Sequence, residues 1–272
     1  MNPSKSRTAV RKLCMIVAVF GLASSLLAYG QDNPKPARLT FDIASIKPSK
    51  PGGAGGGIKA MPGGEEYVAQ NAPVILMISL MFKVPIRQIS GAPDWVNNDL
   101  YEVDAKADHP YNIDDLHTMF QNLLVDEFKM QFHKETREGP VYALTVDKSG
   151  LKMKVNDTPQ DFEIPIKASP DGVFTGKRVP MQYLCWWLSQ NALRANPRPV
   201  IDLTGLDKLY DFQLTFLPEL PPNFPTENLP PGFLDRPSIF DALRVQLGLK
   251  LEPQKGPVEY FVIDHIEKPA AN

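Results

Sequence analysis

Gly139-Pro140-Val141 recurs later in the chain as Gly256-Pro257-Val258. Each copy follows an amphipathic apolar run and precedes a run with the alternating pattern of a β-strand. The two prolines are 117 residues apart, at positions 140 and 257, and repetition at that length indicates duplicated domains or half-domains. The chain is therefore predicted to contain one structural unit twice, with each Gly-Pro-Val segment starting the second strand of a hairpin.

The first predicted unit covers residues 39–155 and interleaves strands with two helices. Its opening strand pattern stops at Pro48, and Pro73 suits the first turn of a helix whose apolar residues recur every three or four positions. In chain order, the expected elements are strand 39–47, Gly-rich loop 51–64, strand 67–69, helix 73–82, strands 87–90 and 101–105, helix 114–128, and strands 130–134 and 141–146.

The second predicted unit covers residues 156–267 and repeats this order. The positions that correspond are Pro73 with Pro180, Ser90-Gly91 with Thr204-Gly205, and Tyr101 with Tyr210. The expected elements are strands 162–167 and 173–175, helix 180–188, strands 200–203 and 210–216, a Pro-rich inserted loop 218–237, helix 238–247, and a hairpin of strands 249–252 and 259–263. The fold class is therefore α+β, with each half an antiparallel-rich sheet that has two helices on one face, and residues 268–272 form a tail.

The N-terminus has the three parts of a secretory signal peptide. Four basic residues precede an apolar run over residues 13–27, and Ala28-Tyr29-Gly30 provides small residues at a cleavage site. We expect residues 1–30 to be removed after Gly30 and residues 31–38 to form a linker. An uncleaved membrane anchor is the alternative, but the apolar run is shorter than the roughly 20 residues that a membrane span needs.

Cleavage changes the charge of the chain. Four of the 29 basic residues and none of the 31 acidic residues lie within residues 1–30, so the remaining chain has a net charge of −6. A mildly acidic, mixed surface disfavours nucleic acid and anionic membranes as partners. Cys185 is the single cysteine left, so no intramolecular disulfide can form. The sequence predicts an exported protein, periplasmic or extracellular, with no membrane span after cleavage.

Five motifs in chain order resemble one family. They are Phe41 to Ser49, Ile89 to Trp95, Phe132 to Thr136, Asp202 to Leu206, and Leu247 to Glu252. Together they resemble a large exported family of the acidobacterial type, classified as a domain of unknown function. Some of its members carry this region behind a BlaR1-like metallopeptidase, whose motif His-Glu-x-x-His is absent from this sequence. The resemblance implies no catalytic residue. At the level of fold alone, the units also resemble the short N-terminal domains of secretins and TonB-dependent receptors, which bind proteins.

Potential metal ligands are densest around His109, Asp114 and His117. Imidazole and carboxylate groups suit several metal ions. However, the set spans a turn and the start of a helix, where acidic residues are favoured by the helix dipole alone. We therefore predict no metal site, and keep these three residues as the candidates should one exist.

Three further features have a simpler structural interpretation. Cys185 lies in an apolar helical run, where a free cysteine is typically a small buried residue. Trp186 and Trp187 are candidates for stacking on a ligand, but neighbours on a helix point about 100° apart, so at least one is expected in the core. The loop Gly52 to Gly57 lacks the Lys-Ser/Thr ending of a phosphate-binding loop. We therefore expect no cofactor.

Two functions remain open from the sequence. The first is a non-enzymatic binding or interaction module, whose partner is an envelope protein or a small ligand. The alternative is an extracytoplasmic hydrolase with a site assembled from residues distant in sequence. A deep pocket with convergent groups of shifted pKa would favour a small-molecule or catalytic site. A broad groove or an open sheet edge would favour a protein partner.

Overall fold

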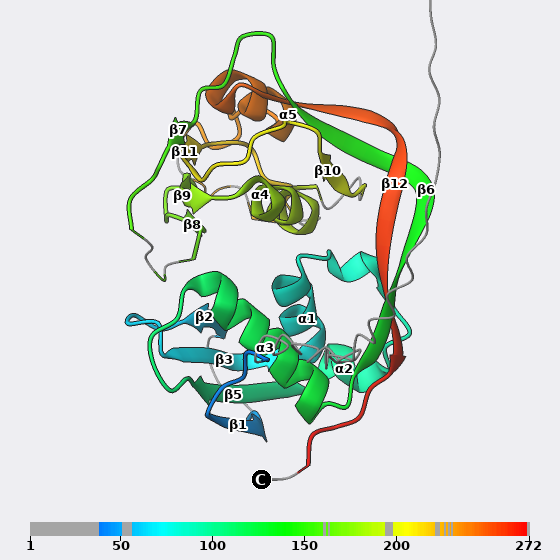
Figure 1. Ribbon diagram of the computed structural model, residues 1–272. Coiled ribbons are helices and arrows are strands. Elements are labelled where there is room, and N and C mark those ends of the chain that lie inside the picture. Colours follow the sequence, from blue (N-terminus) through cyan, green and yellow to red (C-terminus); the bar gives the residue numbers. More distant parts are fainter. Residues whose placement is uncertain are drawn as a thin grey trace, which may run out of the picture. The chain divides into compact units, whose positions relative to one another are not determined.

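The computed structural model describes residues 38–50, 56–159, 162, 164–193, 198–220, 224–225, 227, 229 and 231–270 (Figure 1). Residues Arg38–Asn272 form one compact unit. The predicted signal peptide, its cleavage site and all but one residue of the predicted linker lie outside the described residues. Within the described part, no helix is long and apolar enough to cross a membrane.

The first lobe is a four-stranded antiparallel sheet with three helices. The sheet has the order β1 (Ile43–Pro48), β5 (Leu100–Lys106), β3 (Glu66–Pro73), β2 (Gly57–Ala60). The helices are α1 (Val74–Phe82), α2 (Asp94–Asn98) and α3 (Ile113–Glu127). Sheet and helices enclose one apolar core, in which α1 is buried along most of its length.

Local sequence explains where the two longer helices begin and end. Pro73 precedes α1 in an extended conformation, and the helix ends at Lys83, whose φ of 54° is left-handed. The side chain of Asn112 accepts a hydrogen bond from the Asp115 amide and so caps α3. The apolar face of α3 is then buried in the core, as its three-and-four spacing predicts.

The second lobe has a sheet of the same type. Its order is β7 (Lys154–Val155), β11 (Tyr210–Leu214), β9 (Phe174–Val179), β8 (Ile166–Ala168), and all pairs are antiparallel. Helix α4 (Met181–Trp187) continues as the π-helical segment η2 (Leu188–Ala192). Helix α5 (Ile239–Ala242) continues as the π-helical segment η4 (Leu243–Leu247) and ends at Gly248. These elements surround a second apolar core.

A long ribbon of two antiparallel strands serves both lobes. Strand β6 (Gln131–Val146) pairs with β12 (Leu249–His265) from one end to the other, as Figure 1 shows. Short β10 (Val200–Asp202) pairs in parallel with β6. The 3₁₀ turn η1 (Ile86–Gln88) leads into β4 (Ile89–Ser90), which pairs in parallel with β12. The ribbon thus becomes a four-stranded mixed sheet.

The predicted hairpins at the two Gly-Pro-Val segments are wrong. Gly139 and Gly256 lie opposite each other in the middle of β6 and β12, and neither segment makes a turn. A Cβ atom on either glycine would lie 3.1 Å from the Cγ2 atom of Val258 or Val141, so each glycine leaves room for the valine of the other segment. Among the described strands, no third strand pairs with β6 or β12 at the Gly-Pro-Val segments. The outer edge of each strand is therefore open there, and proline is tolerated at such an edge.

Each predicted unit contributes a strand to the core of the other lobe. Phe261 and Ile263 of β12 are buried in the first lobe. Tyr142 and Leu144 of β6 are buried in the second. The two cores are therefore not divided at the sequence boundary between residues 155 and 156, and the predicted domain limits stay predictions.

Each lobe has a bulge of the same kind near the end of a sheet strand, just before a helix. In the first lobe the bulge is in β3 before α1, and in the second it is in β9 before α4. In β3, Asn71 has a φ of 48° and donates its amide to a carboxylate oxygen of Glu102 at 3.0 Å. In β9, Arg178 has a φ of 51° and donates its amide to a carboxylate oxygen of Asp211 at 2.8 Å. These details agree with a repeated unit, although the duplication of whole halves stays a prediction.

The α+β class is confirmed, with sheets that are mostly antiparallel. Two local predictions need correction. The stretch expected as a Gly-rich loop contains β2, in which Ile58 and Ala60 alternate with exposed residues and face the core. Helix α2 was not expected, because its five residues are too few to show a helical period.

Candidate functional site

A cavity of about 680 Å³ lies between the two lobes. We call it the cleft. Its first-lobe wall comes from β2, β3, α1 and the start of α3, and its second-lobe wall from β9, α4 and the segment before β8. The volume lies within the range of roughly 300 to 1,000 Å³ that is usual for small-molecule sites.

A histidine and a tyrosine meet in the first-lobe wall. His117 lies on the first turns of α3, and its Nε2 atom is 3.1 Å from the hydroxyl of Tyr67 on β3. Burial, followed by the nearby positive charge of Lys83, lowers the pKa of His117 to about 3. Burial also raises the pKa of Tyr67. Both side chains are therefore neutral at physiological pH and act as hydrogen-bonding groups.

Lys83 supplies a cation inside the cleft. Its left-handed backbone ends α1, and its Nζ atom donates to the carbonyl oxygen of Leu80 at 2.5 Å. Nζ also lies 5.9 Å from the centre of the Tyr183 ring. Within the described part of the chain, no carboxylate forms an ion pair with it. Burial lowers its pKa to about 8, against a smaller opposing effect of Asp114, so the amine is still mostly protonated at neutral pH.

The second-lobe wall is aromatic. Tyr183 and Trp186 of α4 lie with ring centres 5.3 Å apart and are both buried. The Trp186 indole donates its Nε1 hydrogen to Ser79 Oγ on α1 at 3.1 Å, which is a buried hydrogen bond between the lobes. Burial raises the pKa of Tyr183 to about 12. This wall offers apolar ring surface together with one hydroxyl.

The charges that line the cleft are mainly basic. Lys59, Lys177 and Arg178 join Lys83 in the lining, and Asp114 is the one carboxylate among the described lining residues. Arg178 is held in place, because its guanidinium donates to the carbonyl oxygen of Thr158. Among the described residues of the lining, basic side chains thus outnumber acidic ones, in a chain whose formal net charge is −2. Such a combination of apolar walls and basic groups attracts amphipathic anions.

A smaller cavity of about 220 Å³ adjoins the cleft. We call it the rear chamber. Lys83, Gln182 and Trp186 line both cavities. Gln88 also lines the chamber and is 7% exposed; its Nε2 atom donates to the backbone oxygen of Glu259 at 2.7 Å. The Oε1 atom of Gln88 is buried without a hydrogen-bond partner in the described part of the chain.

The residues singled out from the sequence separate into two groups. Asp114, His117 and Trp186 line the cleft. Trp187 packs against Phe174 in the second core, with ring centres 5.1 Å apart.

His109 lies apart from the other two metal-ligand candidates. It is exposed, with Nδ1 3.0 Å from a carboxylate oxygen of Asp108, and its ring is tilted by 31° against that of Tyr111, with ring centres 4.1 Å apart. Among the described residues, no group of three or more His, Cys, Asp or Glu side chains is arranged to hold a metal ion.

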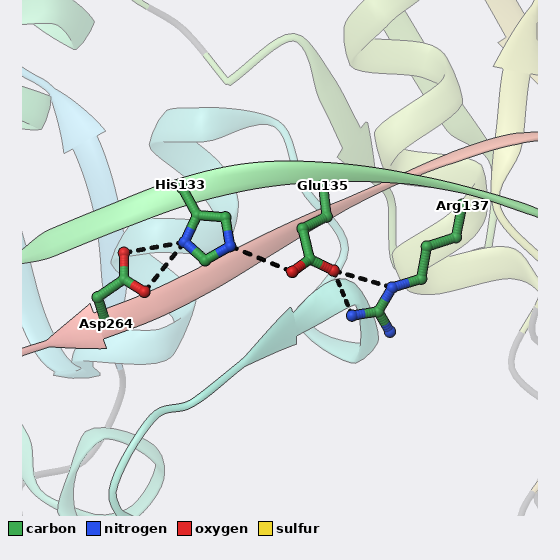
Figure 2. A network of polar contacts seen from close by, with 4 residues as sticks. All are labelled: His133, Glu135, Arg137 and Asp264. Atoms are coloured by element: carbon green, nitrogen blue, oxygen red, sulfur yellow. Dashed lines mark hydrogen bonds and ion pairs between the residues drawn. The ribbon is translucent and has the colours of Figure 1, made fainter.

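A second polar cluster lies on the exposed surface of the ribbon (Figure 2). His133 Nδ1 is 2.9 Å from a carboxylate oxygen of Asp264, and its Nε2 is 3.2 Å from Glu135. Arg137 donates to the other oxygen of Glu135, with Nε at 2.9 Å. The bond to Asp264 is the main reason that the pKa of His133 is raised. These side chains face solvent, so we assign them no chemistry.

Comparison with known proteins identifies the family. Residues 75–266 match the family described as protein of unknown function, DUF3738. The chain belongs to this family. The match covers more than half of the sequence and includes all but the first residue of α1, helices α3 and α4, and the whole ribbon, whereas the motif Phe41 to Ser49 lies before it. No curated protein and no solved structure matches the chain.

The site of this DUF3738 protein contains residues that the sequence did not reveal. Tyr67 and His117 are 50 positions apart, and Ser79 and Trp186 are 107 apart, so spacing cannot bring either pair together. Lys83 had one usable signal, because a lysine directly after an apolar helix can bond the last carbonyl groups of that helix. That signal indicates a helix end, not a ligand site.

Proposed function

We propose that this protein binds a small amphipathic anion in the cleft. The observation that carries the proposal is Lys83, a cation between apolar walls with no carboxylate partner among the described residues. Moving an ammonium group out of water is costly unless an opposite charge compensates it. A carboxylate, sulfonate or phosphate on the ligand would supply that charge.

The aromatic wall determines the rest of the ligand. Tyr183 and Trp186 present ring faces, and Leu76, Leu80 and Phe162 add apolar surface. Burying about 100 Å² of apolar ligand surface contributes roughly 2.5 kcal/mol before the entropic cost of binding. The ligand is therefore a molecule with an aromatic or aliphatic body and one anionic end.

A hydrolase is the less favoured alternative, because the serine and cysteine side chains near the cleft, Ser79 and Cys185, are not activated as nucleophiles. The Ser79 hydroxyl is fully buried and accepts the Trp186 hydrogen bond. Burial, with a smaller effect of Asp202, raises the pKa of Cys185, which keeps it as the unreactive thiol. The convergent groups of the cleft favour recognition over acyl transfer.

The N-terminal sequence supports a place of action outside the cytoplasm. Basic residues, an apolar run and small residues occur there in the order of a signal peptide. We therefore propose that the ligand is met in the periplasm or outside the cell. Mass spectrometry of the exported protein would show an N-terminus near Gln31, and retention of Met1 in a membrane fraction would contradict it.

The binding proposal is tested with two fluorescent dyes that differ in charge. 8-Anilino-1-naphthalenesulfonate carries a sulfonate, and N-phenyl-1-naphthylamine has the same rings without it. We expect the anionic dye to bind at least about tenfold more tightly, a difference of about 1.4 kcal/mol.

Matched variants locate the binding. Lys83→Met should remove the preference for the anionic dye, whereas Lys255→Met, which makes the same charge change on the ribbon, should keep it. Equal affinities for the two dyes in the natural protein, or an equal loss in both variants, would contradict the proposal.

A further inference from the structure

Lys83 occupies an unusual place, because it lines the cleft and the rear chamber at once. Gln182 and Trp186 line both cavities with it. Its position is fixed by the left-handed residue that ends α1 and by the hydrogen bond from Nζ to Leu80. Lys83 therefore lies where a reactive group held in the cleft can meet its side chain.

The groups around Lys83 favour its charged form only weakly. Asp114 favours the ammonium, but at longer range than an ion pair, and His117 is neutral. The Tyr183 ring and the apolar walls remove water from the amine. With a pKa of about 8 instead of 10.5, the neutral fraction of this amine at pH 7 is larger than that of an exposed lysine by roughly two orders of magnitude.

A neutral amine beside an open cavity is a nucleophile for carbonyl compounds. We propose that Lys83 captures ligands that carry an aldehyde group, by forming an imine in the cleft. The inference rests on the proposed function, because the apolar walls and the basic residues of the cleft other than Lys83, such as Lys59 and Arg178, bring the ligand to the amine. The ligand class is thereby narrowed to small amphipathic anions with a reactive carbonyl group.

The step balances without any redox partner. The Nζ lone pair attacks the carbonyl carbon, a C–N bond forms, and the carbonyl oxygen takes a proton while nitrogen loses one. The hydroxyl group of this carbinolamine then leaves with a proton as water, and the C=N bond of the imine forms. The protons are exchanged with solvent water, while the Tyr67 hydroxyl and His117 Nε2, 3.1 Å apart in the wall of the cleft, are neutral hydrogen-bonding groups.

The test uses 4-carboxybenzaldehyde with sodium cyanoborohydride, which reduces an imine to a stable secondary amine. The full exported chain is treated at pH 7, and peptide mapping by mass spectrometry gives the rate of modification at each lysine. We expect Lys83 to react at least about tenfold faster than any other lysine. The expected gain in reaction rate is smaller than the gain in the neutral fraction of the amine, because the nucleophilicity of an amine falls as its pKa falls.

Two variants and one competitor sharpen the result. Lys83→Arg should abolish the fast reaction, and Lys255→Arg should leave it unchanged. Excess 4-methylbenzoate, which has the anion and ring but no aldehyde, should slow labelling of Lys83 alone in the natural protein, so the test does not depend on a variant that folds. Labelling spread evenly over the exposed lysines would overturn the proposal.

The outcomes separate this inference from the proposed function. If the anionic dye binds through Lys83 but the aldehyde does not label it faster, imine formation is wrong and anion binding stands. If Lys83 reacts fast but neither the dye nor 4-methylbenzoate binds in the cleft, the lysine is reactive and the preference for anions is wrong.

Discussion

Trp186 joins the two lobes through one buried hydrogen bond, from its indole nitrogen to Ser79. The Ser79→Ala change would leave the indole N–H buried without an acceptor. Such a loss costs about 1 to 3 kcal/mol, and chemical denaturation should show that decrease in the free energy of unfolding. In Trp186→Phe, which has no donor, adding Ser79→Ala should cost much less. A decrease below about 0.5 kcal/mol for Ser79→Ala in the natural protein would contradict the role of this bond.

His117 makes stability depend on acidity. Its pKa is lowered to about 3 in the folded protein, so between about pH 6.5 and pH 3 the unfolded chain binds a proton that the folded chain does not. Stability therefore falls as pH falls through this window. His117→Gln keeps a hydrogen-bonding group for Tyr67 but cannot titrate. Between pH 6.5 and pH 4, the free energy of unfolding of this variant should fall by less than that of the natural protein, with a difference on the order of 1 to 3 kcal/mol. The same pH dependence of unfolding in both proteins would show that His117 does not have a lowered pKa.

At the scale of the element, the ribbon shows how far sequence patterns reach. The runs around residues 130–134, 141–146, 249–252 and 259–263 were predicted as strands, and they lie in β6 and β12. The Gly-Pro pairs between them were interpreted as turns, because glycine and proline usually interrupt strands. Which interpretation holds depends on the segment opposite, and Gly139 faces Gly256. These two glycines are more than a hundred positions apart, so no local periodicity in the sequence shows that their segments pair.

The polar cluster on the ribbon gives a pH prediction of opposite sign. The hydrogen bond to Asp264 raises the pKa of His133, so the protonated imidazole is favoured in the folded protein. Its contribution to stability is present below the ordinary pKa of about 6.5 and is lost as pH rises through the raised value. NMR titration of the imidazole should give a pKa above that of an exposed histidine, and Asp264→Asn should lower it. Equal values in both proteins would show that the pair does not form in solution.

The bulges of β3 and β9 test the equivalence of the two sheets. Glu102 and Asp211 each accept the amide of a residue with positive φ. Glu102→Ala and Asp211→Ala should each lower the free energy of unfolding by about 1 to 2 kcal/mol. We expect the two decreases in the free energy of unfolding to be similar, because the two bulges would be copies of one structural feature. A large loss in one and none in the other would argue against the repeated unit.

At the scale of the whole molecule, the sequence predicted the class but not the site. Helix α3 follows from its apolar spacing, and helices α1 and α4 follow from apolar spacing together with the prolines that precede them, Pro73 and Pro180. The cleft is made where the two lobes meet, so its residues share no local pattern. His117, Asp114 and Trp186 attracted attention by residue type, whereas Lys83 acquires its properties from burial by both lobes. Only the tertiary arrangement contains that information.

The central claim is that the cleft binds a small amphipathic anion. A crystal structure of the protein grown with 8-anilino-1-naphthalenesulfonate tests it most directly, because it locates the ligand atom by atom. The account predicts that the rings lie against Tyr183 and Trp186, with a sulfonate oxygen within hydrogen-bond distance of Lys83 Nζ. Density for the dye on the outer surface, with the cleft empty, would contradict it.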